Sequence, residues 1–83
     1  MKLIFKKQPD KYLDKCQPKS YLKLKSALLG LEDLKGDIKK LEGQKNEYRL
    51  KLPPYRIIFI YVKGEDFITV TKIKTRGDVY KKG

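Results

Sequence analysis

Three arginines stand out in a chain that otherwise takes its positive charge from lysine. They are Arg49, Arg56 and Arg76, and all three fall within residues 47–80. A guanidinium is a planar fork of donors that matches a phosphate and stays protonated at any working pH, whereas lysine is a flexible point charge. The arginines therefore indicate binding of a phosphate or a similar anion, rather than solubility alone.

The residues around the first arginine alternate between apolar and cationic. Tyr48, Leu50 and Leu52 occupy every second position, and Arg49 and Lys51 lie between them. A period of two predicts a β-strand, whose side chains point alternately to opposite faces of a sheet. One face of this strand is therefore apolar and the other is cationic.

A second strand over residues 55–62 follows after two prolines. It is β-branched or aromatic almost throughout, which is typical of a buried strand. The short loop predicts an antiparallel hairpin in which Lys51 faces Arg56 and Leu50 faces Ile57. Like charges directly opposite each other on a sheet destabilise it by about 0.2–1 kcal/mol. A sequence that keeps such a pair indicates that an anion binds between the two cations.

Length and composition describe one small, strongly basic domain. The 83 residues carry a formal charge of +11, and a chain of this size buries only roughly 60% of its unfolded surface. So high a positive charge favours phosphate polymers or an acidic partner. A lysine-rich surface that only keeps the protein in solution is the alternative, but the placement of the arginines favours a binding role.

Several kinds of chemistry lack the residues that they need. The chain has no histidine and a single cysteine, Cys16. This excludes an internal disulfide, a cysteine metal site, the commonest zinc sites and histidine acid–base catalysis. The longest apolar run, residues 57–62, is far too short to cross a bilayer, and no signal-peptide core begins the chain. We therefore expect a cytoplasmic protein with no metal, no cofactor and no membrane contact.

The remaining pattern predicts a single α+β domain over residues 1–83. The three- and four-residue spacing of Tyr21, Leu24, Leu28 and Leu31 gives a helix an apolar stripe that packs on a sheet. The expected order is β-α-α-β-β-β, a small antiparallel sheet with two helices packed on one face and the cationic face of the hairpin left open. The chain should begin with a strand at 2–6, followed by a helix that opens at 9–10 and ends by 17. A second helix runs from 18 to about 29 or 30. A linker over 32–45, with room for one helical turn at 38–41, leads to the hairpin, and a last strand covers 67–75.

Four motifs taken together resemble the RelE/ParE superfamily, the toxins of bacterial and archaeal toxin–antitoxin modules. The motifs are DIKKLEG at 37–43, YRLK at 48–51, YRII at 55–58 and RGDVY at 76–80, and the likeness covers nearly the whole chain. The resemblance implies a cognate antitoxin protein, whose acidic amphipathic segment would wrap the basic surface. It also implies one of two activities, because RelE-like members cut messenger RNA in the ribosomal A site, whereas ParE-like members poison DNA gyrase.

The RelE-like branch carries a set of cleavage residues that this sequence matches. The set comprises two basic residues two positions apart on one strand, an arginine on the next strand, an arginine after the last strand and a tyrosine near the end. By this resemblance the site residues are Arg49, Lys51, Arg56, Arg76 and Tyr80. All five positions carry usable side chains, so the resemblance favours a metal-independent endoribonuclease over a ParE-like gyrase inhibitor.

These residue types also suit RNA cleavage without a metal. In such a reaction the 2′-hydroxyl attacks the adjacent phosphate and leaves a 2′,3′-cyclic phosphate and a 5′-hydroxyl, which requires a base, an acid and cations for the growing charge. Lys51 is the candidate base, and Arg56 is placed to stabilise the phosphorane. Arg76 would bind the scissile phosphate and assist the leaving group, and Tyr80 would either stack on a base or orient the 2′-hydroxyl.

Two simpler interpretations stay open at this point. Each residue alone has a structural explanation: Arg49 and Lys51 as a solvated strand face, Arg76 as part of a turn, and Tyr80 as a packing residue. The second interpretation is a plain RNA-binding module, which would expose aromatic side chains for stacking. The aromatic residues of the hairpin are instead predicted to face the core, which weighs against such a module. They are Tyr48, Tyr55, Phe59 and Tyr61.

Overall fold

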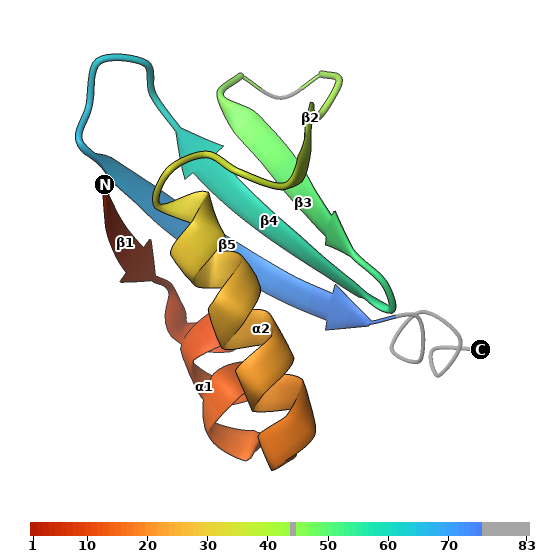
Figure 1. Cartoon of the computed structure of the whole chain (residues 1–83). Coiled ribbons are helices and arrows are strands. Elements are labelled where there is room, and N and C mark those ends of the chain that lie inside the picture. The colour runs from red at the N-terminus through yellow and green to blue at the C-terminus, as the bar shows by residue number, and fades with distance from the viewer. Residues whose placement is uncertain (44, 76–83) are drawn as a thin grey trace.

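Two helices lie on one face of a five-stranded sheet in the part of the chain that the computed structural model describes, residues 1–43 and 45–75 (Figure 1). The predicted α+β class, with both helices on one face, is therefore confirmed. In chain order the elements are β1 (Lys2–Phe5), α1 (Lys7–Lys15), α2 (Pro18–Leu31), β2 (Asp37–Lys40), β3 (Glu47–Leu52), β4 (Tyr55–Tyr61) and β5 (Phe67–Thr75).

The strands lie in the order β1-β5-β4-β3-β2. Neighbours are antiparallel except β1 and β5, which run parallel. The sheet is therefore mixed, whereas the sequence predicts an antiparallel sheet. The cause is the helical connection, which carries the chain from β1 at one edge to β2 at the other. Four strands then return across the sheet until β5 lies beside β1.

β2 is a strand where the sequence predicts a linker with one helical turn, and that prediction is wrong. Asp37 pairs with Lys51 of β3, and Lys39 pairs with Arg49. Residues 37–40 contain one apolar side chain, Ile38, so their hydrophobic period is too weak to show a strand. The strand forms because the backbone groups along β3 need partners, a requirement that no local propensity reveals.

Both helices lie close to their predicted positions. α1 begins at Lys7, before the predicted opening at Pro9, and the proline is buried within the first turn, where its missing N–H costs no helical hydrogen bond. α2 begins at Pro18 as predicted and extends to Leu31.

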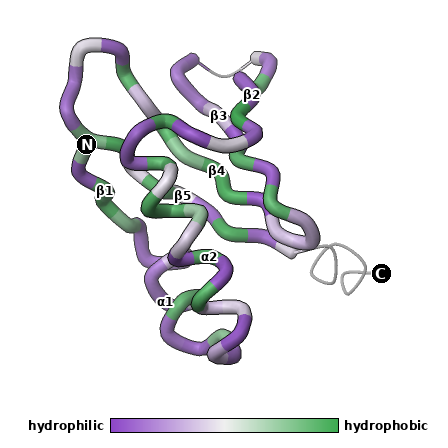
Figure 2. The backbone as a smooth tube through the Cα atoms, viewed as in Figure 1, coloured by the Kyte–Doolittle hydropathy of each residue, from purple (hydrophilic) through white to green (hydrophobic). Residues whose placement is uncertain are grey.

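The apolar stripe of α2 packs on the sheet as predicted. Leu24 and Leu31 are fully buried and Leu28 nearly so, whereas Tyr21 at the margin remains 38% exposed. β4 is hydrophobic over most of its length, as expected of a central strand (Figure 2). The strand residues that complete the core are Leu50, Ile57, Phe59, Ile68, Val70 and Ile73.

A bulge in β5 keeps the apolar residues of that strand on the core face. Thr71 has no Cα partner on β4, and its hydroxyl donates a hydrogen bond to the carbonyl of Ile58 at 3.2 Å. Val70 and Ile73 are three positions apart and both fully buried, which regular alternation would not allow. The extra residue lets both Val70 and Ile73 point to the core, and it leaves the two lysines of β5 on the opposite face.

The hairpin of β3 and β4 has the register that the alternation predicts. Lys51 faces Arg56, and Leu50 faces Ile57. The turn between them contains a cis peptide bond between the two prolines.

Two hydrogen bonds between α2 and the hairpin hold this turn against the helix. The hydroxyl of Tyr55 donates to Ser20 Oγ at 2.5 Å, and Lys23 Nζ donates to the carbonyl of Pro53 at 2.8 Å. The helix therefore supports the end of the hairpin nearest to Lys51 and Arg56.

Candidate active site

Three of the five predicted site residues share the open face of the sheet. On β3, Arg49 and Lys51 flank Leu50, which is 2% exposed; on β4, Arg56 precedes the fully buried Ile57. Leu50 and Ile57 belong to the core beneath the helices. Because side chains alternate along a strand, the three cations lie on the face that the helices leave uncovered.

A first row of charged residues crosses four strands on this face. Asp37 lies opposite Lys51, Lys51 opposite Arg56, and Arg56 opposite Lys74. Neighbouring strands are about 4.8 Å apart, so three cations occupy consecutive positions in the row. Within residues 1–43 and 45–75 no ion pair joins the carboxylate of Asp37 to any of the three.

A second row lies two residues further along the strands. Lys39 faces Arg49, Arg49 faces Ile58, and Ile58 faces Lys72. Two residues along a strand correspond to roughly 7 Å, so the rows are close enough to act on one extended ligand. We call the cations of the two rows the cationic grid: Lys39, Arg49, Lys51, Arg56, Lys72 and Lys74.

Arg49 is the least exposed cation of the grid. Its Nη1 atom is buried and has no hydrogen-bond partner among the described residues. Leaving a buried polar group unpaired costs about 1–3 kcal/mol, and more when the group is charged. A bound anion would recover that cost, because guanidinium and phosphate form short, charge-assisted hydrogen bonds. This nitrogen therefore supports anion binding beside Lys51.

The other two predicted site residues, Arg76 and Tyr80, lie outside the described residues. The described part of β5 ends at Thr75, which faces Tyr55 at the hairpin turn. The proposed roles of Arg76 and Tyr80 therefore stay predictions.

The aromatic residues of the hairpin lie on the core face, as the alternation predicts. Tyr48 stacks on Phe59 with ring centroids 5.6 Å apart, and its ring lies 6.4 Å from that of Tyr61. Tyr55 meets Tyr12 of α1 edge to face at 6.5 Å. These four hairpin rings are not placed to stack on bases over the grid, which weighs against the plain RNA-binding module.

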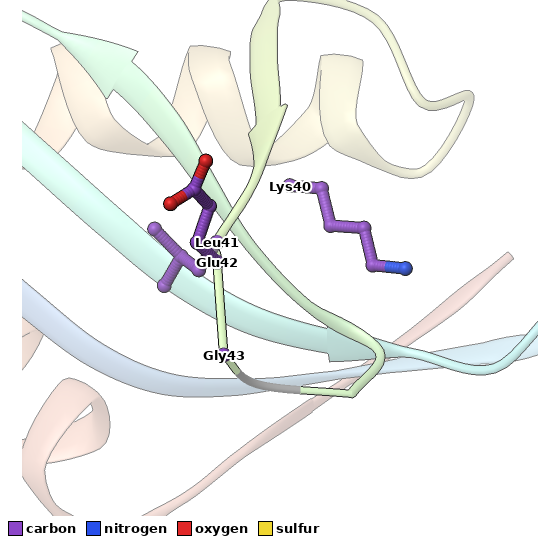
Figure 3. A pocket seen from close by; sticks show the side chains of 4 residues that line it. All are labelled: Lys40, Leu41, Glu42 and Gly43. Atoms are coloured by element: carbon purple, nitrogen blue, oxygen red, sulfur yellow. The ribbon is translucent and has the colours of Figure 1, made fainter.

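A pocket beside the turn between β2 and β3 is separate from the grid. It is lined by Lys40, Leu41, Glu42 and Gly43 (Figure 3), none of which is a predicted site residue. Lys40 extends away from Leu41 and Glu42 in Figure 3. It follows Lys39 on β2 and pairs with Tyr48, so it lies on the other face of the strand and outside the grid.

Neither a metal cluster nor a membrane-spanning helix accompanies the grid among the described residues. In residues 1–43 and 45–75, no group of three histidine, cysteine, aspartate or glutamate side chains could hold a metal ion. No helix in that part of the chain is long and apolar enough to cross a membrane.

Three grid lysines were not predicted as site residues. Lys39 lies on β2, the strand that the sequence pattern does not reveal. Lys72 and Lys74 flank the buried Ile73, so their spacing does carry a signal of one cationic face. The bulge at Thr71 hides it, because the alternation of β5 changes phase at that residue.

Comparison with known proteins identifies the fold through structure. No protein-family model and no curated protein sequence matches the chain. The crystal structure of the isolated Escherichia coli RelE toxin is 22% identical, covers 98% of this chain and 92% of its own, and superposes with a TM-score of 0.76.

Two archaeal structures are more similar in sequence. RelE in the RelB–RelE antitoxin–toxin complex of Methanococcus jannaschii is 25% identical over 95% of this chain and 96% of that one, with a TM-score of 0.71. The RelE–RelB complex of Pyrococcus horikoshii gives 28% identity over 92% and 94%, with a TM-score of 0.69. The chain therefore has the fold of the RelE-like toxin superfamily, the family that its motifs resemble.

Proposed function

We propose that this protein is the toxin of a toxin–antitoxin pair and that it cleaves messenger RNA at the open face of its sheet. The observation that carries the proposal is the placement of Lys51 directly opposite Arg56, with Arg49 on the same face and its Nη1 without a hydrogen-bond partner in residues 1–43 and 45–75. Opposed cations cost stability, and a phosphate between them would remove the cost.

The proposed reaction uses side chains only. Lys51 takes the proton of the RNA 2′-hydroxyl as the 2′-oxygen attacks the adjacent phosphorus. The new bond from phosphorus to the 2′-oxygen forms while the bond to the 5′-oxygen breaks, and Arg49 and Arg56 stabilise the charge on the phosphorane. The products are a 2′,3′-cyclic phosphate and a 5′-hydroxyl.

The leaving 5′-oxygen needs a proton, and the predicted residues for that half of the site are Arg76 and Tyr80. In our proposal Arg76 binds the scissile phosphate and assists the leaving 5′-oxygen, which takes its proton from solvent water, and Tyr80 orients the substrate or stacks on a base. Both assignments rest on the resemblance of residues 76–80 to the RelE motif.

The proposed partners follow from the fold and the charge. RelE of Methanococcus jannaschii and of Pyrococcus horikoshii was solved in complex with RelB, which supports an antitoxin partner for this chain. Its charge of +11 suits an acidic antitoxin and an RNA target. We further propose that cleavage takes place on the ribosome, in the A site, and hence in the cytoplasm.

The test is to induce the wild-type chain briefly in bacteria and map new RNA 5′ ends across translated messages. We expect new ends within codons, and we expect the Arg56→Ala variant to lower their yield by about 10²–10³-fold, the usual loss for one donor to the transition state. Lys63→Ala is the matched control, because it removes one charge from the turn after β4 and should cleave like the wild type.

Other results would redirect the assignment. Growth arrest without new ends would contradict cleavage and favour the ParE-like alternative, a toxin that inhibits DNA gyrase. Equal cleavage by Arg56→Ala and Lys63→Ala would mean that the opposed pair is not the active site.

A further inference from the structure

The cationic grid is larger than one phosphate requires. A phosphate between Lys51 and Arg56 occupies only the middle of the first row. Lys39 and Lys72 stand at the two ends of the second row, three strand spacings apart, or about 14 Å. The ends of the grid therefore remain without an anion when the cleaved phosphate alone is bound.

The grid is built into the sheet, since two departures from regular structure create it. The bulge at Thr71 puts Lys72 and Lys74 on the open face while Val70 and Ile73 stay buried. β2, with little hydrophobic pattern of its own, adds Lys39 beside Arg49. Without the bulge and β2, the open face would hold only the three cations of the hairpin, Arg49, Lys51 and Arg56.

The chemistry of the face favours a nucleic-acid backbone as the ligand. Its cations are arranged in two rows, whereas the hairpin aromatics lie on the other face. Within the described residues the grid brings together charged side chains and none of the four hairpin rings, an arrangement suited to contacts with phosphates. Several cations spread over four strands suit a chain of phosphates better than a single nucleotide.

We propose that Lys39, Lys72 and Lys74 bind the phosphates that flank the cleaved bond, so that single-stranded RNA crosses the sheet from β5 to β2. We call this path the RNA track. This inference rests on the proposed cleavage at Lys51 and Arg56. It assigns binding roles to three lysines outside the predicted cleavage set. An acidic protein segment on the same grid is the competing occupant, which the experiment below separates.

The experiment measures the affinity of the full chain for a fully 2′-O-methylated RNA 12-mer at a series of salt concentrations, by fluorescence anisotropy. The methyl groups remove the attacking hydroxyl, so binding is measured without cleavage. Each phosphate contact in a single-stranded complex contributes about 0.7 to the slope of log K against log salt. We expect Lys39→Ala, Lys72→Ala and Lys74→Ala each to lower the slope by about that amount.

Lys40→Ala is the matched control. It removes the same charge from the residue next to Lys39, but on the opposite face of β2. We expect it to keep the wild-type slope. If Lys39→Ala and Lys40→Ala give equal slopes, and the β5 variants follow them, the RNA track is wrong.

Cleavage, measured in parallel by 5′-end mapping, separates this inference from the proposed function. Cleavage by the wild type with no slope change in the three lysine variants overturns the track and leaves the function standing. Absent cleavage with the expected slope changes overturns the function and supports the track as an RNA-binding surface. Unchanged RNA slopes combined with weaker binding of the cognate antitoxin assign the grid to the protein partner and overturn the RNA track.

Discussion

The helix-covered face of the sheet and its open face come from the same strands, but their side chains interact in opposite ways. On β4, Phe59 is fully buried against the core, whereas its neighbour Ile60 on the open face is 38% exposed. On β3, Leu50 faces Ile57 across the hairpin while the next pair, Lys51 and Arg56, opposes two positive charges. Stability and anion binding are thus assigned to alternate residues of one strand pair.

The two faces also differ in the sign of their contribution to folding. Burying an aliphatic or aromatic side chain stabilises a protein by about 1.5–3 kcal/mol. Opposed like charges on a sheet destabilise it by about 0.2–1 kcal/mol per pair. The opposed charges therefore lower the stability that the core face supplies, and removing one of them should shift stability in the opposite direction from truncating a buried core residue.

The largest effect is expected at Phe59 on the core face. Phe59→Ala removes a fully buried ring that stacks on Tyr48, and such truncations cost about 3–5 kcal/mol. Small domains have total stabilities of about 5–15 kcal/mol, so the variant should be largely or wholly unfolded at moderate urea. Urea denaturation followed by circular dichroism measures the change.

Ile60→Ala is the control for Phe59→Ala, since it truncates the next residue on the open face. We expect a change below about 1 kcal/mol, because a partly exposed side chain loses less burial. Equal losses for the two variants would mean that both faces of β4 are covered, and the distinction between the faces would fail.

A smaller effect is expected at Gly36, which leads the chain into β2. Its φ is +125°, and a Cβ there would lie 2.5 Å from Leu50 Cδ1 on the core face. Gly36→Ala should therefore destabilise the protein both through backbone strain, about 1–2 kcal/mol, and through crowding of the core, about 1–3 kcal/mol.

Gly64 is the control that separates backbone strain from crowding. Its φ is +100°, but a Cβ at that position would meet no atom within 4 Å beyond its chain neighbours. Gly64→Ala should show the backbone cost alone, measured by the same urea denaturation. A Gly36→Ala variant no less stable than Gly64→Ala would show that Leu50 moves aside easily and that the core face is loosely packed there.

The hairpin and the helix stripe could be predicted from the sequence because their signals are local. Strict alternation over residues 47–52 fixes which side chains share a face, and a one-residue slip would bury Lys51. The spacing of Leu24, Leu28 and Leu31 likewise fixes the side of α2 that packs on the sheet. Three site candidates, Arg49, Lys51 and Arg56, followed from these patterns.

The rest of the open face depends on pairing between distant segments. β2 has only Ile38 as an apolar residue, so its strand character comes from β3 and not from its own sequence. The phase change at Thr71 depends on how β5 meets β4, and it decides where Lys72 and Lys74 point. A single sequence shows neither pairing, and half of the grid was missed for that reason.

The smallest effect tests the open face itself. Arg56→Gln keeps much of the side-chain stem but removes the charge that faces Lys51 on one side and Lys74 on the other. We expect the variant to be more stable than the wild type by about 0.2–1 kcal/mol in low salt. The gain should shrink as salt rises, because exposed charges are screened over about 3 Å at 1 M ionic strength. Urea denaturation at two salt concentrations measures both expectations.

Lys63→Gln is the matched control for this change, since it lowers the net charge equally but lies in the turn after β4, where the strand pairs of the described residues place no charge opposite it. Its stability should change less than that of Arg56→Gln in low salt. A loss of stability in Arg56→Gln would show that Arg56 makes a favourable contact within the folded chain, and would contradict the inference that the Lys51–Arg56 pair is unfavourable until an anion binds. A gain in stability together with lost cleavage would show that the fold keeps an unfavourable pair of charges for the sake of its ligand.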